Sequence, residues 1–233
     1  MPSKSGLPPA NSQARRWLAE ETRWPSADAA AWVKRFVEHV CHAPTTVALV
    51  LIGSLARATH DPSDVDLLYV YEREPVGFSG HPMDVDIRAY ENDDFRSRLA
   101  RRHEVVTWAL RFGRVICQRD VFWSELISSF TGELPLPSPE MSERRAERAA
   151  EIYDQLIEIG DQDAALEQRI SLLTHRAWAR LLRKRIHPAS RPELIEQLRV
   201  AGEASLAGDL AAALRERTVA KSAAESARRR RAG

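Results

Sequence analysis

The sequence predicts an α+β fold with a small mixed sheet, followed by an all-α helical bundle. Short strand-like segments lie in the first half of the chain, among stretches with helical periodicity. Amphipathic helical segments fill the second half, and residues 131–143, with three prolines, separate the two patterns. We therefore expect a first domain over residues 1–134, a helical domain over residues 135–219 and a basic flexible tail over residues 220–233.

The composition is that of a folded protein with balanced charge. The chain has 233 residues, of which 44% are hydrophobic, enough for a buried core. Lysine plus arginine number 34 and aspartate plus glutamate 33, so the net charge of +1 gives no general attraction to nucleic acid or to anionic lipid. Any such attraction must be local, as in the tail, where Lys221 and Arg228 to Arg231 outweigh Glu225.

Cysteine usage and hydropathy bear on the compartment of the protein. Cys41 and Cys117 are too few for a disulfide scaffold and lack metal-binding spacing, which favours a reducing compartment. No apolar run approaches the ~18 residues that a membrane span needs, and the N-terminal segment has no apolar stretch typical of signal peptides. We expect a soluble, cytoplasmic protein with no membrane partner.

The first half is predicted to combine helices with short strands. A helical segment around Trp17 precedes a longer helix that begins near Ser26 and continues to Val40. The unbroken apolar run 47–52 is too short to stand alone as a helix and predicts a strand buried on both faces. Further strands are expected at 65–71, 83–90 and 115–117, and one helix at 95–112.

The second half is predicted to form an antiparallel bundle of four helices. Apolar residues at helical spacing predict helices over 149–157, from a cap at Asp163 to Leu181, from Ser190 to just before Gly202, and over 206–214. Ser190 and Glu193 have the spacing of a capping box, and Gly202 suits the position just beyond a helix end.

Two aspartates at the start of the strand 65–71 are the first candidate site residues. Side chains alternate along a strand, so Asp64 and Asp66 project to the same face. Like charges at close range disfavour joint ionisation, and a divalent cation between the carboxylates resolves the conflict. Magnesium suits such a site because it prefers hard oxygen ligands and commonly binds through one or two carboxylates plus substrate phosphates.

A glycine-serine pair and a second acidic strand complete the pattern. Gly53 lets the backbone approach an anion closely, Ser54 adds a hydroxyl donor, and a turn into a helix presents free N–H groups to phosphate. Asp84 and Asp86 again lie on one face, and one of them could complete a two-metal site. Two ions roughly 3.5–4 Å apart stabilise the attacking and departing oxygens of an in-line displacement at phosphorus.

Gly53-Ser54, Asp64-x-Asp66 and the later acidic strand together resemble the polymerase β-like nucleotidyltransferases, especially their small, minimal members. The resemblance covers about residues 45–120. It implies a nucleotidyltransferase fold, Asp64 and Asp66 as ligands of two Mg²⁺ ions, and Gly53 and Ser54 as contacts to the nucleotide triphosphate. The run from Val85 to Phe95 resembles the family's third strand and following helix, which favours Asp86 as the third ligand, with Asp84 as the alternative. Many relatives carry glycine where this chain has Ala58, a departure that concerns the loop over the phosphates more than the metal site.

The resemblance also implies a reaction: transfer of a nucleoside monophosphate, most often AMP from ATP, to a hydroxyl, with pyrophosphate as the leaving group. The acceptor is an open question, with an antibiotic or other small molecule, a protein hydroxyl and an RNA 3′ end as alternatives. Glu151, Asp154 and Glu158 are candidates for a separate general base, and their spacing selects none of them.

The helical half resembles HEPN-type domains in two segments, 156–165 and 190–194. Such bundles help to bind substrate or mediate dimerisation, so a homodimer is one expectation, and some are RNases with an Arg…His motif, for which Arg180 and His187 have compatible spacing. Arg169, Arg176, Arg180, Arg183 and His187 fall within roughly 60° of a helix circumference and form a basic stripe. The alternatives to a transferase are therefore an RNase and a non-catalytic interaction protein, for instance a toxin–antitoxin component.

Overall fold

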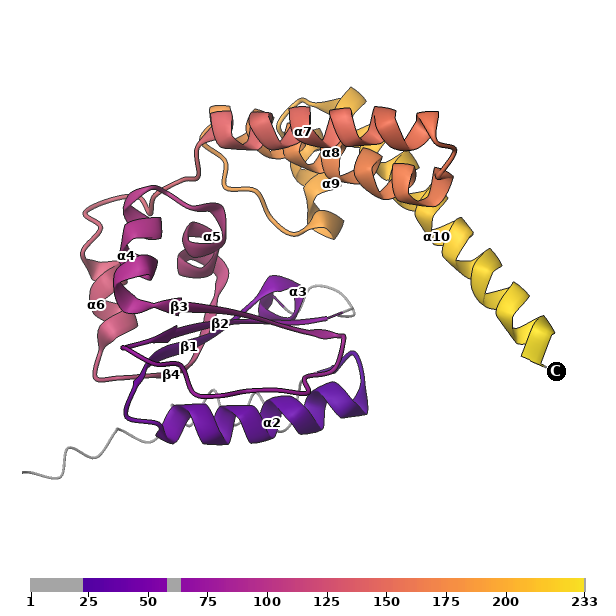
Figure 1. The fold of residues 1–233 in the computed structure, drawn as a ribbon. Helices are drawn as coiled ribbons and strands as arrows, with labels where there is room; N and C mark the ends of the chain where they lie inside the picture. Colours follow the sequence, from indigo (N-terminus) through magenta and orange to yellow (C-terminus); the bar gives the residue numbers. More distant parts are fainter. Residues whose placement is uncertain (1–22, 58–63, 233) are drawn as a thin grey trace, which may run out of the picture. The chain divides into compact units, whose positions relative to one another are not determined.

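The computed structural model describes residues 23–57 and 64–232, in two compact units that divide between Pro135 and Leu136 (Figure 1). The first unit combines a four-stranded mixed sheet with helices, and the second is entirely helical. The predicted class, α+β with a small mixed sheet plus a helical bundle, is confirmed. The helical segment expected around Trp17 and the loop residue Ala58 lie outside the described residues.

The sheet has the strand order β3-β2-β1-β4 (Figure 1). Its strands are β1 (Thr46–Ile52), β2 (Val65–Tyr71), β3 (Val85–Glu91) and β4 (Arg114–Gln118). β1 runs antiparallel to both β2 and β4, whereas β2 and β3 are parallel. The start of β2, the start of β3 and the end of β1 therefore meet at one end of the sheet.

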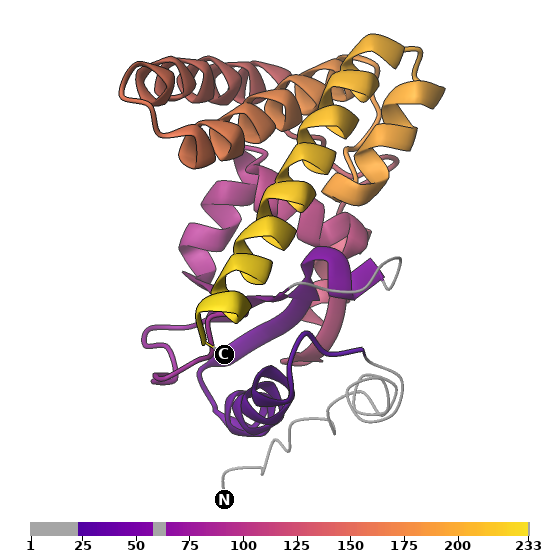
Figure 2. The same ribbon diagram turned by 90° about the vertical axis from the view of Figure 1, so that its right-hand side faces the viewer.

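Helices cover both faces of the sheet (Figures 1 and 2), which explains why every residue of β1 is buried. The helix α2 (Ala27–His42) packs on one face, where Phe36 belongs to the same apolar cluster as the odd-numbered residues Leu49, Leu51 and Leu67. The Ser26 side chain caps α2 by accepting the Ala29 N–H, as its place in the sequence predicts.

The opposite face carries α4 (Asn92–Ala100), α5 (Glu104–Phe112) and α6 (Phe122–Ser128). The prediction of one helix over 95–112 is wrong, because the chain turns between α4 and α5. Arg102 adopts a φ of 55°, and the N–H groups of Arg102 and His103 bond back to the carbonyls of Leu99 and Arg98 at 2.8 and 2.9 Å. The helix α6 was not predicted.

Cys41 and Cys117 form a disulfide, which runs against the expectation of a reducing compartment. The residues are 76 positions apart in sequence, but α2 packs against the sheet so that their Cα atoms lie 5.8 Å apart. The bond joins the C-terminal end of α2 to the edge strand β4. Sequence spacing carries no sign of this pairing, because only the tertiary packing of α2 creates it.

The second unit contains α7 (Pro139–Glu158), α8 (Gln162–Arg183), α9 (Arg191–Val200) and α10 (Ala204–Ala232). Its core includes Ile170, Leu194, Leu198 and Leu210. Ser138 caps α7. Asp161 caps α8, two residues before Asp163, the cap that the sequence predicted. The helix α10 continues through the segment expected to be a flexible tail. Among the described residues, no helix is both long and apolar enough to cross a membrane.

The end of α8 removes His187 from the predicted basic stripe. Arg185 adopts a φ of 59°, and the Ile186 N–H bonds back to the Leu181 carbonyl at 2.9 Å, so the helix stops at Arg183. His187 is 6% exposed and lies in the connection to α9. The prediction that His187 continues the arginine face of α8 is therefore wrong.

Candidate functional site: acidic residues at the end of the sheet

The predicted carboxylates meet at the end of the sheet where β1 finishes and β2 and β3 begin. Asp66 pairs with Ile52 on one side and with Asp86 on the other in the strand register. Gly53 follows Ile52 directly and opens the short helix α3 (Gly53–Arg57). Asp66 therefore lies between the glycine-serine pair and the second acidic strand.

The sheet face that carries Asp66 is fixed by strand alternation. Val65 and Leu67 point into the apolar layer beneath α2, so Asp66 projects to the other face with Leu68 and Val70. On that face, Leu68 and Val70 are covered by apolar side chains of α4, α5 and α6. The strand β2 thus presents core residues along most of this face and a carboxylate at its start.

Gly53 and Asp66 are in close contact. Gly53 has a φ of 73°, in the left-handed region that favours glycine. A Cβ at position 53 would lie 2.9 Å from Asp66 Cγ and closer still to one carboxylate oxygen. The sequence predicted a glycine that admits phosphate, and the structure adds a second reason for it: only glycine leaves room for the Asp66 carboxylate.

Ser54 holds a buried hydroxyl next to this contact. Its Oγ has no hydrogen-bond partner in the part of the chain that the structure describes. A buried hydroxyl without a partner costs free energy, which an added ligand group would recover. Since α3 spans five residues, its dipole contributes little, and the predicted role of free helix N–H groups is correspondingly weak.

Burial and neighbouring negative charge make Asp66 unusual among the acidic residues. Burial is the largest cause that raises the pKa of its carboxyl, to about 6, and the charges of Asp64 and Asp86 raise it further, whereas Arg88 lowers it. A carboxyl group that binds a cation is expected to have a raised pKa when the cation is absent.

The structure separates the two candidates for the third carboxylate. Ser26 Oγ donates a hydrogen bond to Asp84 Oδ2 at 2.6 Å, so the Asp84 side chain is held at the start of α2. Asp86 lies beside Asp66 in the parallel register, where its charge acts on the Asp66 carboxyl. The negative charges of Asp64 and Asp86 thus act on the Asp66 carboxyl, whereas Asp84 is not among the charges that raise its pKa.

The donor set fits magnesium. In residues 23–57 and 64–232, no three His, Cys, Asp or Glu side chains are close enough to form a ready-made metal cage. Asp86 forms an ion pair with Arg88 at 3.1 Å, and its side chain is half exposed. Magnesium commonly binds through one or two carboxylates and completes its shell with water and phosphate oxygens, so the Asp64 and Asp66 carboxylates with a buried hydroxyl nearby suit it.

Two arginines near the site were not assigned a role from the sequence. Arg88 lies two residues after Asp86 on β3, and strand alternation places both on one face. Arg57 ends α3, and its guanidinium carbon lies 4.3 Å from the centre of the Phe112 ring. Alternation along the acidic strand was the signal for Arg88, whereas nothing in the sequence pairs Arg57 with Phe112.

The candidate general bases lie in the helical unit. Glu151, Asp154 and Glu158 are exposed residues of α7, and Glu151 pairs with Arg148 at 3.1 Å. No feature of α7 distinguishes one of the three as a base, so the general base stays a prediction.

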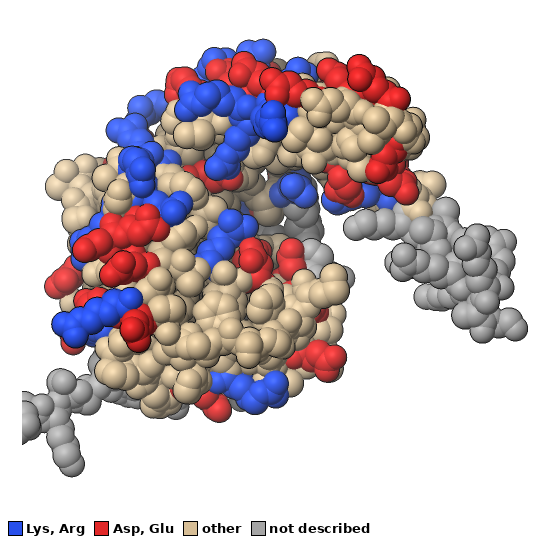
Figure 3. All heavy atoms as spheres, viewed as in Figure 1, with Lys and Arg blue, Asp and Glu red and all other residues tan. Residues whose placement is uncertain are grey.

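The surface agrees with the balanced composition. On the face of the molecule in Figure 3, acidic and basic side chains are interspersed over both units. A chain of net charge +1 distributed in this way has no broad basic face for a polyanion on the side shown.

Comparisons with known proteins give structural likenesses but no sequence match. The chain matches no family in a comparison with protein families and no protein in a comparison with curated sequences. Among solved structures, a nucleotidyltransferase-like protein from Exiguobacterium sibiricum 255-15 is similar over 80% of this chain and 74% of its own, with 17% identity and a TM-score of 0.36. That score is too low to equate the two folds.

Proposed function

We propose that the protein is a magnesium-dependent nucleotidyltransferase that transfers a nucleoside monophosphate, AMP from ATP in the first instance, to a hydroxyl acceptor. The acceptor oxygen forms a bond to the α-phosphorus, the bond to the β-phosphate oxygen breaks, and pyrophosphate leaves while the hydroxyl gives up its proton. One observation carries the proposal: the Asp66 carboxyl is packed against Gly53 and surrounded by further negative charge, with a raised pKa.

Asp64, Asp66 and Asp86 would hold two Mg²⁺ ions. When bound, such ions neutralise charge at the α-phosphate and lower the pKa of the attacking hydroxyl. Asp66 is positioned for this role by the contact with Gly53, which holds its carboxyl at the end of the sheet. The half-exposed side chain of Asp86 can leave Arg88 to reach a ligand.

Ser54 and Gly53 would contact the triphosphate. The Ser54 hydroxyl, buried and without a partner, is a donor for a phosphate oxygen. Gly53 would contribute backbone contacts only, since the Asp66 carboxyl fills the space that its side chain would need. The positive charge of Arg88, once released from Asp86, would offset part of the charge on the nucleotide.

The candidates for the acceptor are a small molecule, a protein hydroxyl and an RNA end. A general base from Glu151, Asp154 or Glu158 would take the hydroxyl proton, and each can be tested by substitution with the amide. A homodimer stays a prediction.

The experiment uses ATP labelled at the α-phosphate, Mg²⁺ and a cell lysate as the source of acceptor. We expect label to enter an acceptor with the wild type and to be lost in the double variant Asp64→Ala/Asp66→Ala. Asp93→Asn is a matched control, because Asp93 is an exposed carboxylate on α4 outside the site, and it should retain transfer. Equal labelling by the double variant, or failure of the wild type to bind Mg²⁺ and ATP at millimolar concentration, would overturn the proposal.

The same variants separate the two alternative functions. RNA cleavage that survives the double variant but disappears in His187→Ala would favour an RNase, although the burial of His187 opposes this role. Capture of a protein partner without transfer or cleavage would favour an interaction protein.

A further inference from the structure

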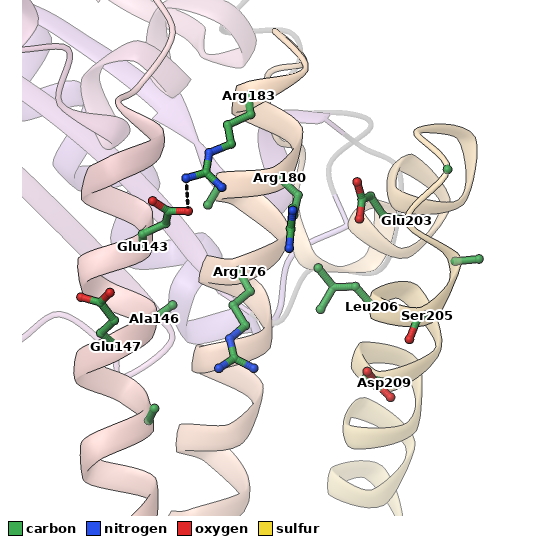
Figure 4. Close-up of a pocket in the computed structure, with 14 residues that line it drawn as sticks. Glu143, Ala146, Glu147, Arg176, Arg180, Arg183, Glu203, Ser205, Leu206 and Asp209 are labelled. Carbon is green, nitrogen blue, oxygen red and sulfur yellow. Dashed lines mark ion pairs between the residues drawn. The ribbon is translucent and has the colours of Figure 1, made fainter.

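A cavity of about 740 Å³ opens between α7, α8 and α10, entirely within the helical unit (Figure 4). The helix α8 forms its floor, and α7 and α10 form its two walls. Alanines such as Ala146 and Ala179 occupy positions where larger side chains would fill the space. The volume is in the range of cavities that hold small-molecule ligands.

Arginines stand on the floor of the cavity. Arg176, Arg180 and Arg183 follow one another at spacings of four and three residues, so they share one face of α8. Arg183 is paired with Glu143 at 2.5 Å. Within the described residues, the guanidinium groups of Arg176 and Arg180 form no ion pair or hydrogen bond. Two planar guanidinium groups one turn apart, each with paired N–H donors, suit a phosphate group.

Carboxylates line both walls. Glu203 on the α10 side is paired with Lys184 at 2.9 Å, as Glu143 is with Arg183. Glu147 on α7 and Asp209 on α10 have no ion-pair or hydrogen-bond partner among the described residues. Figure 4 shows these two carboxylates on opposite sides of the arginines. Arg180 also attracts Glu203, whose carboxylate already pairs with Lys184. The charged groups without an ion pair or hydrogen bond of their own are therefore Arg176 and Arg180 on the floor and Glu147 and Asp209 on the walls.

This arrangement disfavours simple ions. A bare anion on the arginines would face the repulsion of Glu147 and Asp209, and a bare cation on the walls would face the repulsion of Arg176 and Arg180. A ligand that carries both charges satisfies floor and wall together. Charge complementarity thus selects a zwitterion of small-molecule size.

We propose that this cavity binds a phosphorylated amine, with its phosphate on Arg176 and Arg180 and its ammonium group facing Glu147 or Asp209. The proposal is independent of the nucleotidyltransferase function, because every residue of the cavity belongs to the helical unit. It assigns a ligand to the part of the basic stripe that the transferase site does not use.

The test is calorimetric titration of the full-length protein in EDTA, so that the proposed magnesium site stays empty of metal. Three probes separate the charges: O-phosphoethanolamine carries both, inorganic phosphate carries the anion alone and ethanolamine carries the cation alone. We expect O-phosphoethanolamine to bind about tenfold more tightly than either other probe. Inorganic phosphate can pair only with the arginines and ethanolamine only with the wall carboxylates, whereas O-phosphoethanolamine can pair with both. The proposal would be overturned if O-phosphoethanolamine showed no detectable binding at ~10 mM, because a weaker affinity is in the range of nonspecific ion contacts.

Paired variants locate the binding. Arg176→Gln/Arg180→Gln should weaken O-phosphoethanolamine binding about tenfold or more, because two charged hydrogen-bond donors are lost. Glu147→Gln/Asp209→Asn should weaken O-phosphoethanolamine but strengthen inorganic phosphate. Arg148→Gln, on the exposed face of α7, is the matched control and should change neither.

All five substituted side chains are exposed, so circular dichroism should show folded variants. Unchanged binding in the double arginine variant would place the ligand elsewhere. Equal affinity for phosphate and O-phosphoethanolamine, or no effect of removing the wall carboxylates, would show a plain anion site and refute the zwitterion.

Discussion

The carboxyl group of Asp66 occupies the space that a side chain at Gly53 would need. The residue just after one strand and a residue near the start of the next are thereby packed together at the end of the sheet. The contact joins the two parts of the candidate site, the glycine-serine pair and the acidic strand, in one packing unit. Its removal should affect both stability and ligand binding.

Gly53→Ala should destabilise the first unit. The added Cβ would collide with Asp66, and a φ of 73° is strained for alanine. We expect a loss of about 1–2 kcal/mol in the free energy of unfolding from the backbone conformation alone, with a further loss from the displaced carboxyl. Urea denaturation measures the change. Gly77→Ala is the control, because a Cβ there has no heavy atom within 4 Å, and equal stability of the two variants would contradict the contact.

Asp66→Asn should stabilise the metal-free protein at neutral and alkaline pH. The pKa of Asp66 is about 6 in the folded protein, above the value of about 3.9 for an unfolded chain. The contribution of Asp66 to the free energy of unfolding is therefore fully present below pH ~4 and is lost as pH rises through 6. The variant lacks this loss and should be more stable at pH 8 by on the order of 2 kcal/mol.

Urea denaturation in EDTA at pH 4.5 and pH 8 measures this difference between the variant and the wild type. The two proteins should be close in stability at the lower pH and diverge at the higher. Asp93→Asn, an exposed carboxylate, should show no such divergence. A gap of the same size at both pH values would contradict the raised pKa.

Asp86→Asn and Asp84→Asn should differ in their effect on metal binding. Asp86 lies beside Asp66, whereas Asp84 is bonded to Ser26 at 2.6 Å on the α2 side. Titration with Mn²⁺, followed by electron paramagnetic resonance, should show weaker binding by about tenfold in Asp86→Asn, in line with loss of a carboxylate ligand. Asp84→Asn should keep wild-type affinity, and the reverse order would assign the third carboxylate to Asp84.

Reduction of the disulfide should destabilise the first unit. The bond between Cys41 and Cys117 closes a long loop, with a sequence separation of 76. Its loss should lower the free energy of unfolding by on the order of 2–4 kcal/mol. Urea denaturation with and without dithiothreitol measures the effect. Cys41→Ser/Cys117→Ser should match the reduced wild type and ignore the reductant, and a wild type insensitive to dithiothreitol would show that the bond does not form.

Local signals in the sequence predicted much of the first unit. The cap at Ser26, the apolar run of β1 and the alternation of Asp64 and Asp66 with apolar residues all report on neighbouring positions, and the structure has α2, β1 and β2 where these patterns place them. The grouping of Asp64, Asp66 and Asp86 on one sheet face followed from strand alternation and from the family resemblance.

The misses depend on tertiary packing or on unusual backbone conformations. Arg102 and Arg185 have positive φ values and lie where helices end. The sequence gives no sign of these ends, because the residue at such a position is usually glycine. The Cys41–Cys117 bond arises only when α2 lies on the sheet. The hydrogen bond from Ser26 to Asp84, 58 residues away in sequence, is likewise contained in no local pattern.

The pairing of β2 makes correct assembly and activity inseparable. A slip of one residue along β1 and β3 would turn Leu67 toward the face that now carries Asp66, and it would drive the Asp66 carboxyl into the apolar layer under α2. Misaligned chains would be both inert and poorly folded. A sample of well-folded protein should therefore contain few molecules in which the candidate site is misaligned.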